Sequence, residues 1–227
     1  MAMRSRLPNM AACFLLTTLA GATVTASAAP DETWSIGATG GTLGAGPELA
    51  YRNGHYVGIR ADAGFLSYSH NEAVSQIDYN GRLKLDSYGL AADVFPFGGG
   101  FRISAGARKN DNKIELNGTP STSVTVGNNV YTPAQVGTLS GTVKSNSFAP
   151  TISLGYGGAL AKGFTVGAEL GVMFQGTPKV NNYHATGLLA STPAFEADLA
   201  AEEQKVNDKV HSYQYWPIAQ ILLLYRF

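Results

Sequence analysis

Apolar and aromatic residues occupy every second position in the last stretch of the chain, residues 213–227. The set consists of Tyr213, Tyr215, Pro217, Ala219, Ile221, Leu223, Tyr225 and Phe227. The alternate positions include Gln214, Gln220 and Arg226, among further apolar residues. Alternation with a period of two predicts a β-strand with two unlike faces. A continuous apolar face with aromatic residues at both ends is typical of a strand that crosses a bilayer within a β-barrel.

The same alternation recurs in earlier segments of the chain. They are residues 33–39, 43–51, 57–65, 79–97, 101–108, 148–157 and 164–175, which together with the last strand make eight. Within 79–97 the apolar phase changes, because Leu83 and Leu85 fit one face while Tyr88 and Leu90 fit the other. A bulge near Asp86–Ser87 would reconcile the two phases, with Leu83 and Leu85 facing outward. A lipid-facing sheet cannot leave an unpaired edge, so the sequence predicts a closed antiparallel transmembrane β-barrel of all-β class.

The number of strands depends on two connections. Gly40–Gly41 is predicted to be a tight hairpin turn, because glycine accepts the positive φ that such turns require. The alternative is a single bulged strand over 33–51, which would leave an odd number of strands and place the two termini on opposite sides. An even number places both termini on the periplasmic side. A possible small hairpin, Val124–Tyr131, would raise the number from eight to ten if it reached the membrane.

The lengths of the connections are asymmetric, as in outer-membrane barrels. Short turns are predicted on the periplasmic side at 52–55, 96–100 and 158–163. On the outer side we expect a polar loop over 69–76 and two long surface loops, 117–142 and 176–210. Within the second long loop, residues 192–210 have the pattern of a helix. Thr192 suits the N-cap and Pro193 the first helical position, and Phe195, Leu199, Val206 and Val210 fall on one side.

The inward phase of the predicted strands carries charge of both signs. It contains the acids Glu48, Asp62, Asp86, Asp93 and Glu169, and the bases Arg52, Arg60, Lys84, Arg102, Arg108 and Arg226. Eight strands leave an interior that side chains fill, and buried charges are tolerated when they are paired. The near balance of sign predicts an internal ion-pair network and a sealed or nearly sealed lumen, because a selective pore would be lined with one sign.

The N-terminus has the pattern of a secretory signal peptide. Arg4 and Arg6 precede an apolar run from Ala11 to Val24, and the small residues Ala26-Ser27-Ala28 predict cleavage after Ala28. We therefore expect a signal peptide over 1–28 and one barrel domain over 29–227. Without Arg4 and Arg6, the 16 basic residues fall to 14 against 16 acidic ones, a net charge of −2. That balance argues against nucleic acid as a partner.

Several blocks of sequence resemble a widespread, largely uncharacterised group of proteobacterial outer-membrane β-barrel proteins. The blocks are TLGAGPELAYR, LAADVFPFGGGFRISAGARKNDNKIEL, AQVGTLSGTVKSNSFAPTISLGYG, LGVMFQGTP, ADLAAEEQ and the final YRF. Small barrels of the OmpA, OmpX and OmpW types are similar in architecture. The resemblance implies a cell outer-membrane location, with outer-membrane lipids and lipopolysaccharide as neighbours. The terminal Tyr225 and Phe227 resemble the signal by which the last strand engages the barrel-assembly machinery, and we expect a monomer.

Three functions remain open at this stage. The first is a structural or surface-interaction role, with the long loops as the working parts; the second is a narrow pore or carrier for small or hydrophobic solutes. The third is a lipid A-modifying enzyme, for which His70, His184 and His211 would lie on the outer side. His184 is followed by Thr186 where the lipid A deacylases resemble one another in a His-x-Ser pair, so the sequence favours a protein without enzymatic activity. The histidines are scattered along the chain, and the sequence predicts no metal site and no cofactor.

Overall fold

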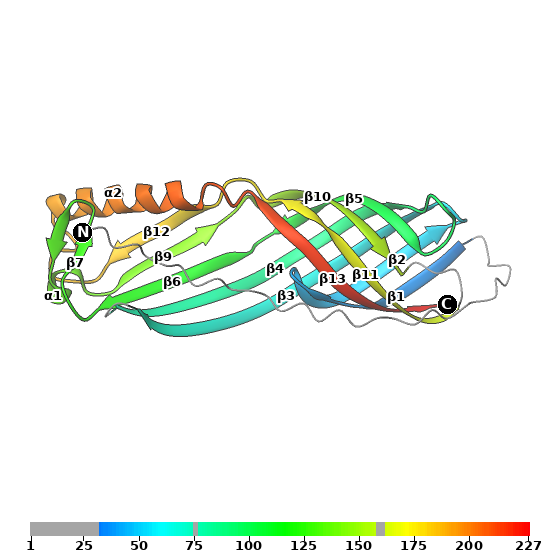
Figure 1. Cartoon of the computed structure of the whole chain (residues 1–227), viewed down its shortest axis with the longest axis horizontal. Helices are drawn as coiled ribbons and strands as arrows, with labels where there is room; N and C mark the ends of the chain where they lie inside the picture. The colour runs from blue at the N-terminus through cyan, green and yellow to red at the C-terminus, as the bar shows by residue number, and fades with distance from the viewer. Residues whose placement is uncertain (1–31, 75–76, 158–161) are drawn as a thin grey trace, which may run out of the picture.

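A computed structural model describes residues 32–74, 77–157 and 162–227. The predicted signal peptide, 1–28, and most of the predicted turn at 158–163 lie outside the described residues. Eight antiparallel strands form a closed ring (Figure 1). They are β1 (Glu32–Gly41), β2 (Gly44–Asn53), β3 (Val57–Val74), β4 (Ile77–Val94), β5 (Phe101–Asn110), β10 (Phe148–Tyr156), β11 (Gly163–Phe174) and β13 (Tyr215–Arg226). The prediction of an eight-stranded antiparallel barrel is confirmed.

The ring closes where the first strand pairs with the last. Ser35 lies opposite Arg226 and Gly41 opposite Gln220, so the two ends of the chain meet along one seam. The other ladder that completes the ring joins β4 to β5, from Ser87 opposite Asn110 to Val94 opposite Ile103. With every edge paired, the backbone groups of the ring have partners within the sheet, as a strand in hydrocarbon requires.

The first hairpin turns two residues later than the sequence suggests. β1 and β2 are ten residues each, and the turn consists of Thr42 and Leu43. Gly44, with φ of 94°, supplies the positive φ after the turn, so Gly41 is part of the strand. Ten residues is about what a tilted strand needs to cross a bilayer. The alternative of one bulged strand over 33–51 is wrong.

The predicted bulge near Asp86–Ser87 is wrong. β3 and β4 pair without any shift from Val57 opposite Val94 to Val74 opposite Ile77, and each strand is 18 residues long. Leu85, which the bulge would have turned outward, is buried in the same phase as Ser87. The strand β4 leaves the barrel at this point, so the surroundings of its two faces change. The apolar residues therefore move from one face of the strand to the other.

Beyond the ring, the sheet continues into a structure that we call the extension. The far half of β4 pairs with β6 (Lys113–Pro120), and the sheet then continues through β9 (Leu139–Lys144) to β12 (Lys179–Ala185). The extension leaves the barrel at the end opposite the C-terminus (Figure 1). The predicted loop over 69–76, as far as it is described, is therefore part of β3 and β4, and each of the two predicted long loops contains strands that belong to the extension.

A helix and a small hairpin complete the extension. The predicted helix is present as α2 (Pro193–Val210), with Thr192 at its N-cap, and packs against β12. The hairpin of β7 (Val124–Val126) and β8 (Asn129–Tyr131) forms a separate two-stranded sheet, so the ten-strand alternative is wrong. A helical turn, α1 (Pro133–Val136), follows it. Val126, Val136 and Phe195 form a core within this part of the extension, with Leu139, Leu189 and Leu199 packed around it.

Candidate functional site

The outer surface of the barrel is apolar and exposed. Leu90, Val166, Leu170 and Ile221 each expose about two thirds of their surface (65–68%) on three different strands. A water-soluble protein rarely exposes a continuous apolar belt of this kind, whereas a barrel in lipid requires one. On β4, the belt ends at Tyr88. The next outward positions are Asp86, Lys84 and Arg82, so the polar outer face of the extension begins there.

Aromatic pairs mark both ends of the apolar belt. At the end with the C-terminus, the ring centroids are 4.9 Å apart for Trp34 and Tyr51 and 5.0 Å apart for Phe164 and Tyr225. Phe227 lies there too, 5.3 Å from Tyr225. At the opposite end, Phe65 packs edge-on to Tyr88 and Phe174 to Tyr215. Two aromatic girdles around an apolar band are the pattern of a membrane-spanning barrel.

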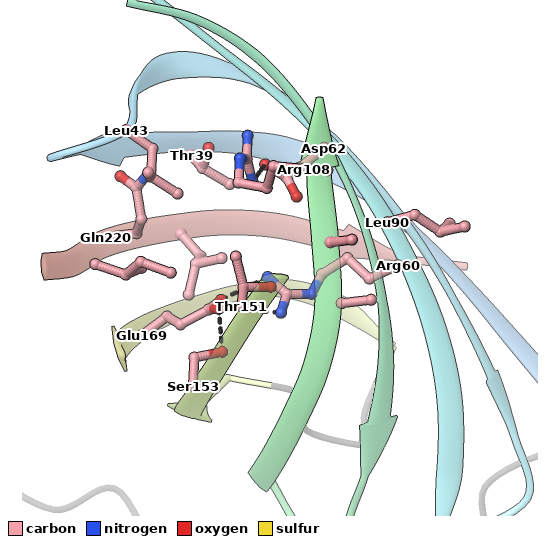
Figure 2. A pocket seen from close by; sticks show the side chains of 15 residues that line it. Thr39, Leu43, Arg60, Asp62, Leu90, Arg108, Thr151, Ser153, Glu169 and Gln220 are labelled. Carbon is pink, nitrogen blue, oxygen red and sulfur yellow. Dashed lines mark hydrogen bonds and ion pairs between the residues drawn. The ribbon is translucent and has the colours of Figure 1, made fainter. Parts of the chain in front are cut away.

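The lumen is crossed by a network of buried ion pairs centred on Arg60. The Arg60 guanidinium lies 2.5 Å from Glu169, 3.4 Å from Asp93 and 3.5 Å from Glu48. Arg102 pairs with the same oxygen of Glu169 at 2.8 Å. These residues come from β2, β3, β4, β5 and β11, so the charges tie together strands from around the ring. Figure 2 shows Arg60 and Glu169 pointing toward one another across the lumen.

Serine hydroxyls complete the hydrogen bonding of the network. Ser153 donates to Glu169 Oε1 at 2.6 Å, and Ser104 donates to Asp93 Oδ1 at 2.6 Å. Both serines are buried. A buried carboxylate costs least when its oxygens accept hydrogen bonds, so these hydroxyls lower the cost of placing charge in the lumen. Both serines lie in the inward phase of their strands, where the sequence analysis considered only the charged residues.

A second ion pair lies beside the network. Arg108 Nη1 is 2.6 Å from Asp62 Oδ2, and Arg108 also donates to the Ser87 hydroxyl at 3.1 Å. Gly89 provides the space for this pair. A Cβ at residue 89 would lie 2.5 Å from both Arg108 Nη1 and Asp62 Oδ1. Gly155 makes room for Arg102 in the same way, at 2.8 Å from its Nε.

Replacing Gly89 by valine should therefore destabilise the barrel by about 1–3 kcal/mol, because the added side chain displaces the Arg108–Asp62 pair. The matched control is Gly40→Val, since a Cβ at residue 40 meets no heavy atom within 4 Å and the position faces outward. Urea titration in detergent, with the folded fraction followed by heat-modifiable migration on gels, measures the stability of both variants. Equal stability of the two variants would contradict this account of Gly89.

The other predicted lumen residues have different surroundings. Arg52 donates to the carbonyl oxygens of Gly98 and Gly99 at 2.9 Å, and its guanidinium lies 3.6 Å from the centroid of the Phe95 ring. It thus holds together the two turns at the end with the C-terminus. Arg226 is buried at the same end, opposite Ser35. Lys84 and Asp86 were assigned to the lumen through the mistaken bulge, and they lie on the outer face of the extension instead.

Apolar side chains fill the lumen above the charges. Leu43, Ala149, Met173 and Ile218 form a buried cluster, against which Trp216 packs. Trp216 Nε1 donates to the Thr42 carbonyl at 3.1 Å, which ties the first hairpin to the last strand. The cavity between this cluster and the network has a volume of about 20 Å³. That is room for about one water molecule.

The three histidines considered for an enzyme lie in separate places. His70 lies on β3 with its ring stacked near Tyr68, His184 lies on β12, and His211 follows α2. Within residues 32–74, 77–157 and 162–227, no group of three or more His, Cys, Asp or Glu side chains is placed to hold a metal ion. In the same part of the chain, no helix has both the length and the apolar character to cross a membrane.

Comparisons with known proteins support the fold and no finer assignment. No protein-family model matches the chain, and no curated protein matches it. Among solved structures, it is similar to CarO2 of Acinetobacter baumannii, with 24% identity and a TM-score of 0.56 over 86% of this chain and 98% of that one. CarO of the same organism gives 22% identity and a TM-score of 0.56 over 85% and 97%. By fold, this chain is a closed antiparallel β-barrel similar to those of solved outer-membrane proteins.

Proposed function

We propose that this protein is a sealed outer-membrane barrel that anchors the extension at the cell surface, where the extension makes the functional contacts. The observation that carries the proposal is the filled lumen. Ion pairs from five strands cross it, an apolar cluster lies above them, and the cavity between holds about 20 Å³. A hydrated solute needs a continuous path several times wider than one water molecule.

The orientation follows from the position of the C-terminus. Barrels of this class place both termini on the periplasmic side. The extension leaves from the other end (Figure 1), so it stands outside the cell. The outer face of its sheet carries Arg82, Lys84, Lys113, Lys144 and Lys179, together with Glu115, directly above the lipid belt. These cations suit the phosphate groups of lipopolysaccharide, and the terminal Tyr225 and Phe227 remain our candidates for the contact with the assembly machinery.

Planar-bilayer recording tests the sealed lumen. We expect the folded mature protein, incorporated at the density of a general porin measured in parallel, to give no stable conductance steps. The porin establishes that the assay detects open channels at this density, and heat-modifiable migration establishes that the barrel is folded. Reproducible unitary steps would overturn the proposal. Swelling of liposomes in glycine or another small solute, without electrical conductance, would favour the carrier that the sequence left open.

A further inference from the structure

The extension contains a cavity much larger than the one in the lumen. It has a volume of about 270 Å³ and lies between the inner face of the extension sheet and α2. Its walls are mainly aliphatic and come from β6, β7, β9, β12 and α2: Leu116, Val126, Leu139, Val143, Val180 and Val206 are among them. Cavities lined by apolar side chains stay dry and take apolar guests, and about 150 Å³ holds one benzene molecule. By the same proportion, this cavity holds roughly ten carbon atoms.

An exposed apolar track continues from the cavity along the sheet. Leu116 lines the cavity, and Ile114 is the next residue on the same face of β6. Ile114 pairs with Leu83, which in turn pairs with Tyr68 on β3. Leu66 follows on that face and is 44% exposed, and Tyr68 is 58% exposed. The track therefore passes from the cavity across three strands toward the mouth of the barrel.

The apolar character of this track requires an explanation, because the extension stands outside the lipid belt. The opposite face of the same strands carries Arg82, Lys84 and Lys113, as a face in water should. An apolar face on a solvated sheet marks a surface that another molecule covers. A cavity continued by a row of apolar side chains across three strands fits a linear chain better than a compact ring system.

One carboxylate, that of Glu202, lines the cavity. The Glu202 carboxylate accepts a hydrogen bond from the Gly127 backbone N–H at 3.3 Å and lies 3.5 Å from Lys205 Nζ. Lys205 also donates to the Gly127 carbonyl. These contacts hold the carboxylate at the hairpin side of the cavity, where it would repel an anionic head group and accept a hydrogen bond from a hydroxyl or ammonium group.

We propose that this cavity and track bind the linear alkyl chain of an amphiphile whose head group is not anionic. The proposal deepens the surface-contact role of the extension given above. Two sources could supply such a chain, a lipid of the membrane below or a free amphiphile from the medium. Conductance does not depend on the extension cavity, so failure of this proposal and failure of the sealed barrel are distinguishable.

Photolabelling tests the proposal in the folded mature protein, reconstituted in lipid nanodiscs. The probe is a ten-carbon primary alcohol that carries a diazirine on its chain, and labelled peptides are mapped by mass spectrometry. Lipid-facing peptides of β11 around Val166 provide the internal reference, because they meet probe dissolved in the bilayer. We expect labelling of α2 and β9 that exceeds the β11 labelling and saturates with probe concentration. Unlabelled decanol should compete, whereas decanoate should compete at least about tenfold less well because of Glu202.

Four variants make the test specific. Val206→Trp fills the cavity from α2 and should lower the apparent affinity by about tenfold or more, since it removes space for several methylene groups. Gln204→Trp places the same side chain on an exposed position of α2 and should change the apparent affinity less than about twofold. Val143→Phe fills the cavity from the sheet, in case Val206→Trp disturbs α2. Glu202→Gln should abolish the preference for decanol over decanoate.

The outcomes show whether an alkyl chain binds and whether it comes from the membrane or from the medium. Lipids are extracted from protein purified from outer membranes. A stoichiometric alkyl lipid that is present in the unaltered protein and absent from Val206→Trp identifies a membrane source. Absence of such a lipid together with saturable decanol binding identifies a free amphiphile. Labelling of α2 no greater than that of β11, or equal labelling of Val206→Trp and Gln204→Trp, would overturn the proposal. Stronger competition by naphthalene than by decanol would also overturn it, because the site would then accept a compact ring.

Discussion

Replacing Arg60 by methionine should lower the free energy of unfolding of the barrel by about 3–5 kcal/mol, the cost of removing one partner from a buried ion pair. Arg60 is 5% exposed and lies within 3.5 Å of Glu48, Asp93 and Glu169, which are themselves 1–6% exposed. Without the guanidinium, three carboxylates would remain in the lumen with Arg102 as the nearest cation. Methionine keeps an unbranched apolar side chain as far as the position of Nε, so the loss measures mainly the charge and hydrogen bonds of the guanidinium.

The measurement is urea titration of the purified protein in detergent, with the folded fraction followed by heat-modifiable migration. Glu48→Gln is the matched control. Neither carboxylate oxygen of Glu48 has a hydrogen-bond partner among the described residues, and the neutral amide relieves the excess of acids around Arg60 and Arg102. We expect Glu48→Gln to change stability by less than about 1 kcal/mol. If Arg60→Met were as stable as Glu48→Gln, the lumen charges would not hold the barrel together.

The barrel was predictable because its two faces meet different surroundings. Lipid outside and packed side chains inside impose a strict alternation, and residues 164–174 and 215–226 show it with little interruption. The inward phase of the sequence contains Arg60, Asp93, Arg102 and Glu169, whose side chains are buried in the lumen. Alternation alone cannot predict which residues pair between strands that are far apart in the chain, such as Arg60 with Glu169. Such pairs depend on the register of the strands around the ring, which alternation does not specify.

The errors in the lumen assignment have a common physical cause. Lys84 and Asp86 were placed inside because a bulge was needed to keep Leu83 and Leu85 in contact with lipid. In the structure, β4 leaves the eight-stranded ring at Asp86, so the outer face becomes polar and the inner face becomes apolar without any shift of register. The same change of surroundings concealed β6, β9 and β12. Arg52 was grouped with the ion pairs because the backbone carbonyls that satisfy it leave no trace in the sequence.

The barrel and the extension have separate apolar cores. One consists of Leu43, Ala149, Met173 and Ile218 in the mouth of the barrel, and the other surrounds Phe195. Long strands β3 and β4 connect them, so the backbone is continuous while the side-chain packing is not. Elements with little shared packing can open independently, and we expect the extension to lose its structure without loss of the ring.

Phe195→Ala should test this independence, with a destabilisation of the extension of about 3–5 kcal/mol, as for other fully buried phenylalanines. Phe195 is completely buried and its ring centroid lies 4.9 Å from that of Tyr131 in an edge-on contact. α2 is also held by the Asp198 carboxylate, which accepts hydrogen bonds from Tyr131 and Asn129 at 2.5 and 2.7 Å. These bonds hold the pKa of Asp198 below its usual range, but one is exposed and the other only partly buried, so they contribute less than the buried ring.

The readout is protease digestion of the mature protein in outer-membrane vesicles, followed by mass spectrometry and gel migration. In Phe195→Ala we expect rapid cleavage within 186–214, whereas the barrel fragment keeps its heat-modifiable migration because the ring ladders and the Arg60 network do not involve Phe195. Leu188→Ala is the control, since Leu188 is 81% exposed and its removal leaves no cavity. Loss of the folded barrel in Phe195→Ala would mean that the two cores depend on one another. Resistance equal to that of Leu188→Ala would mean that α2 is held to the sheet by its polar contacts instead.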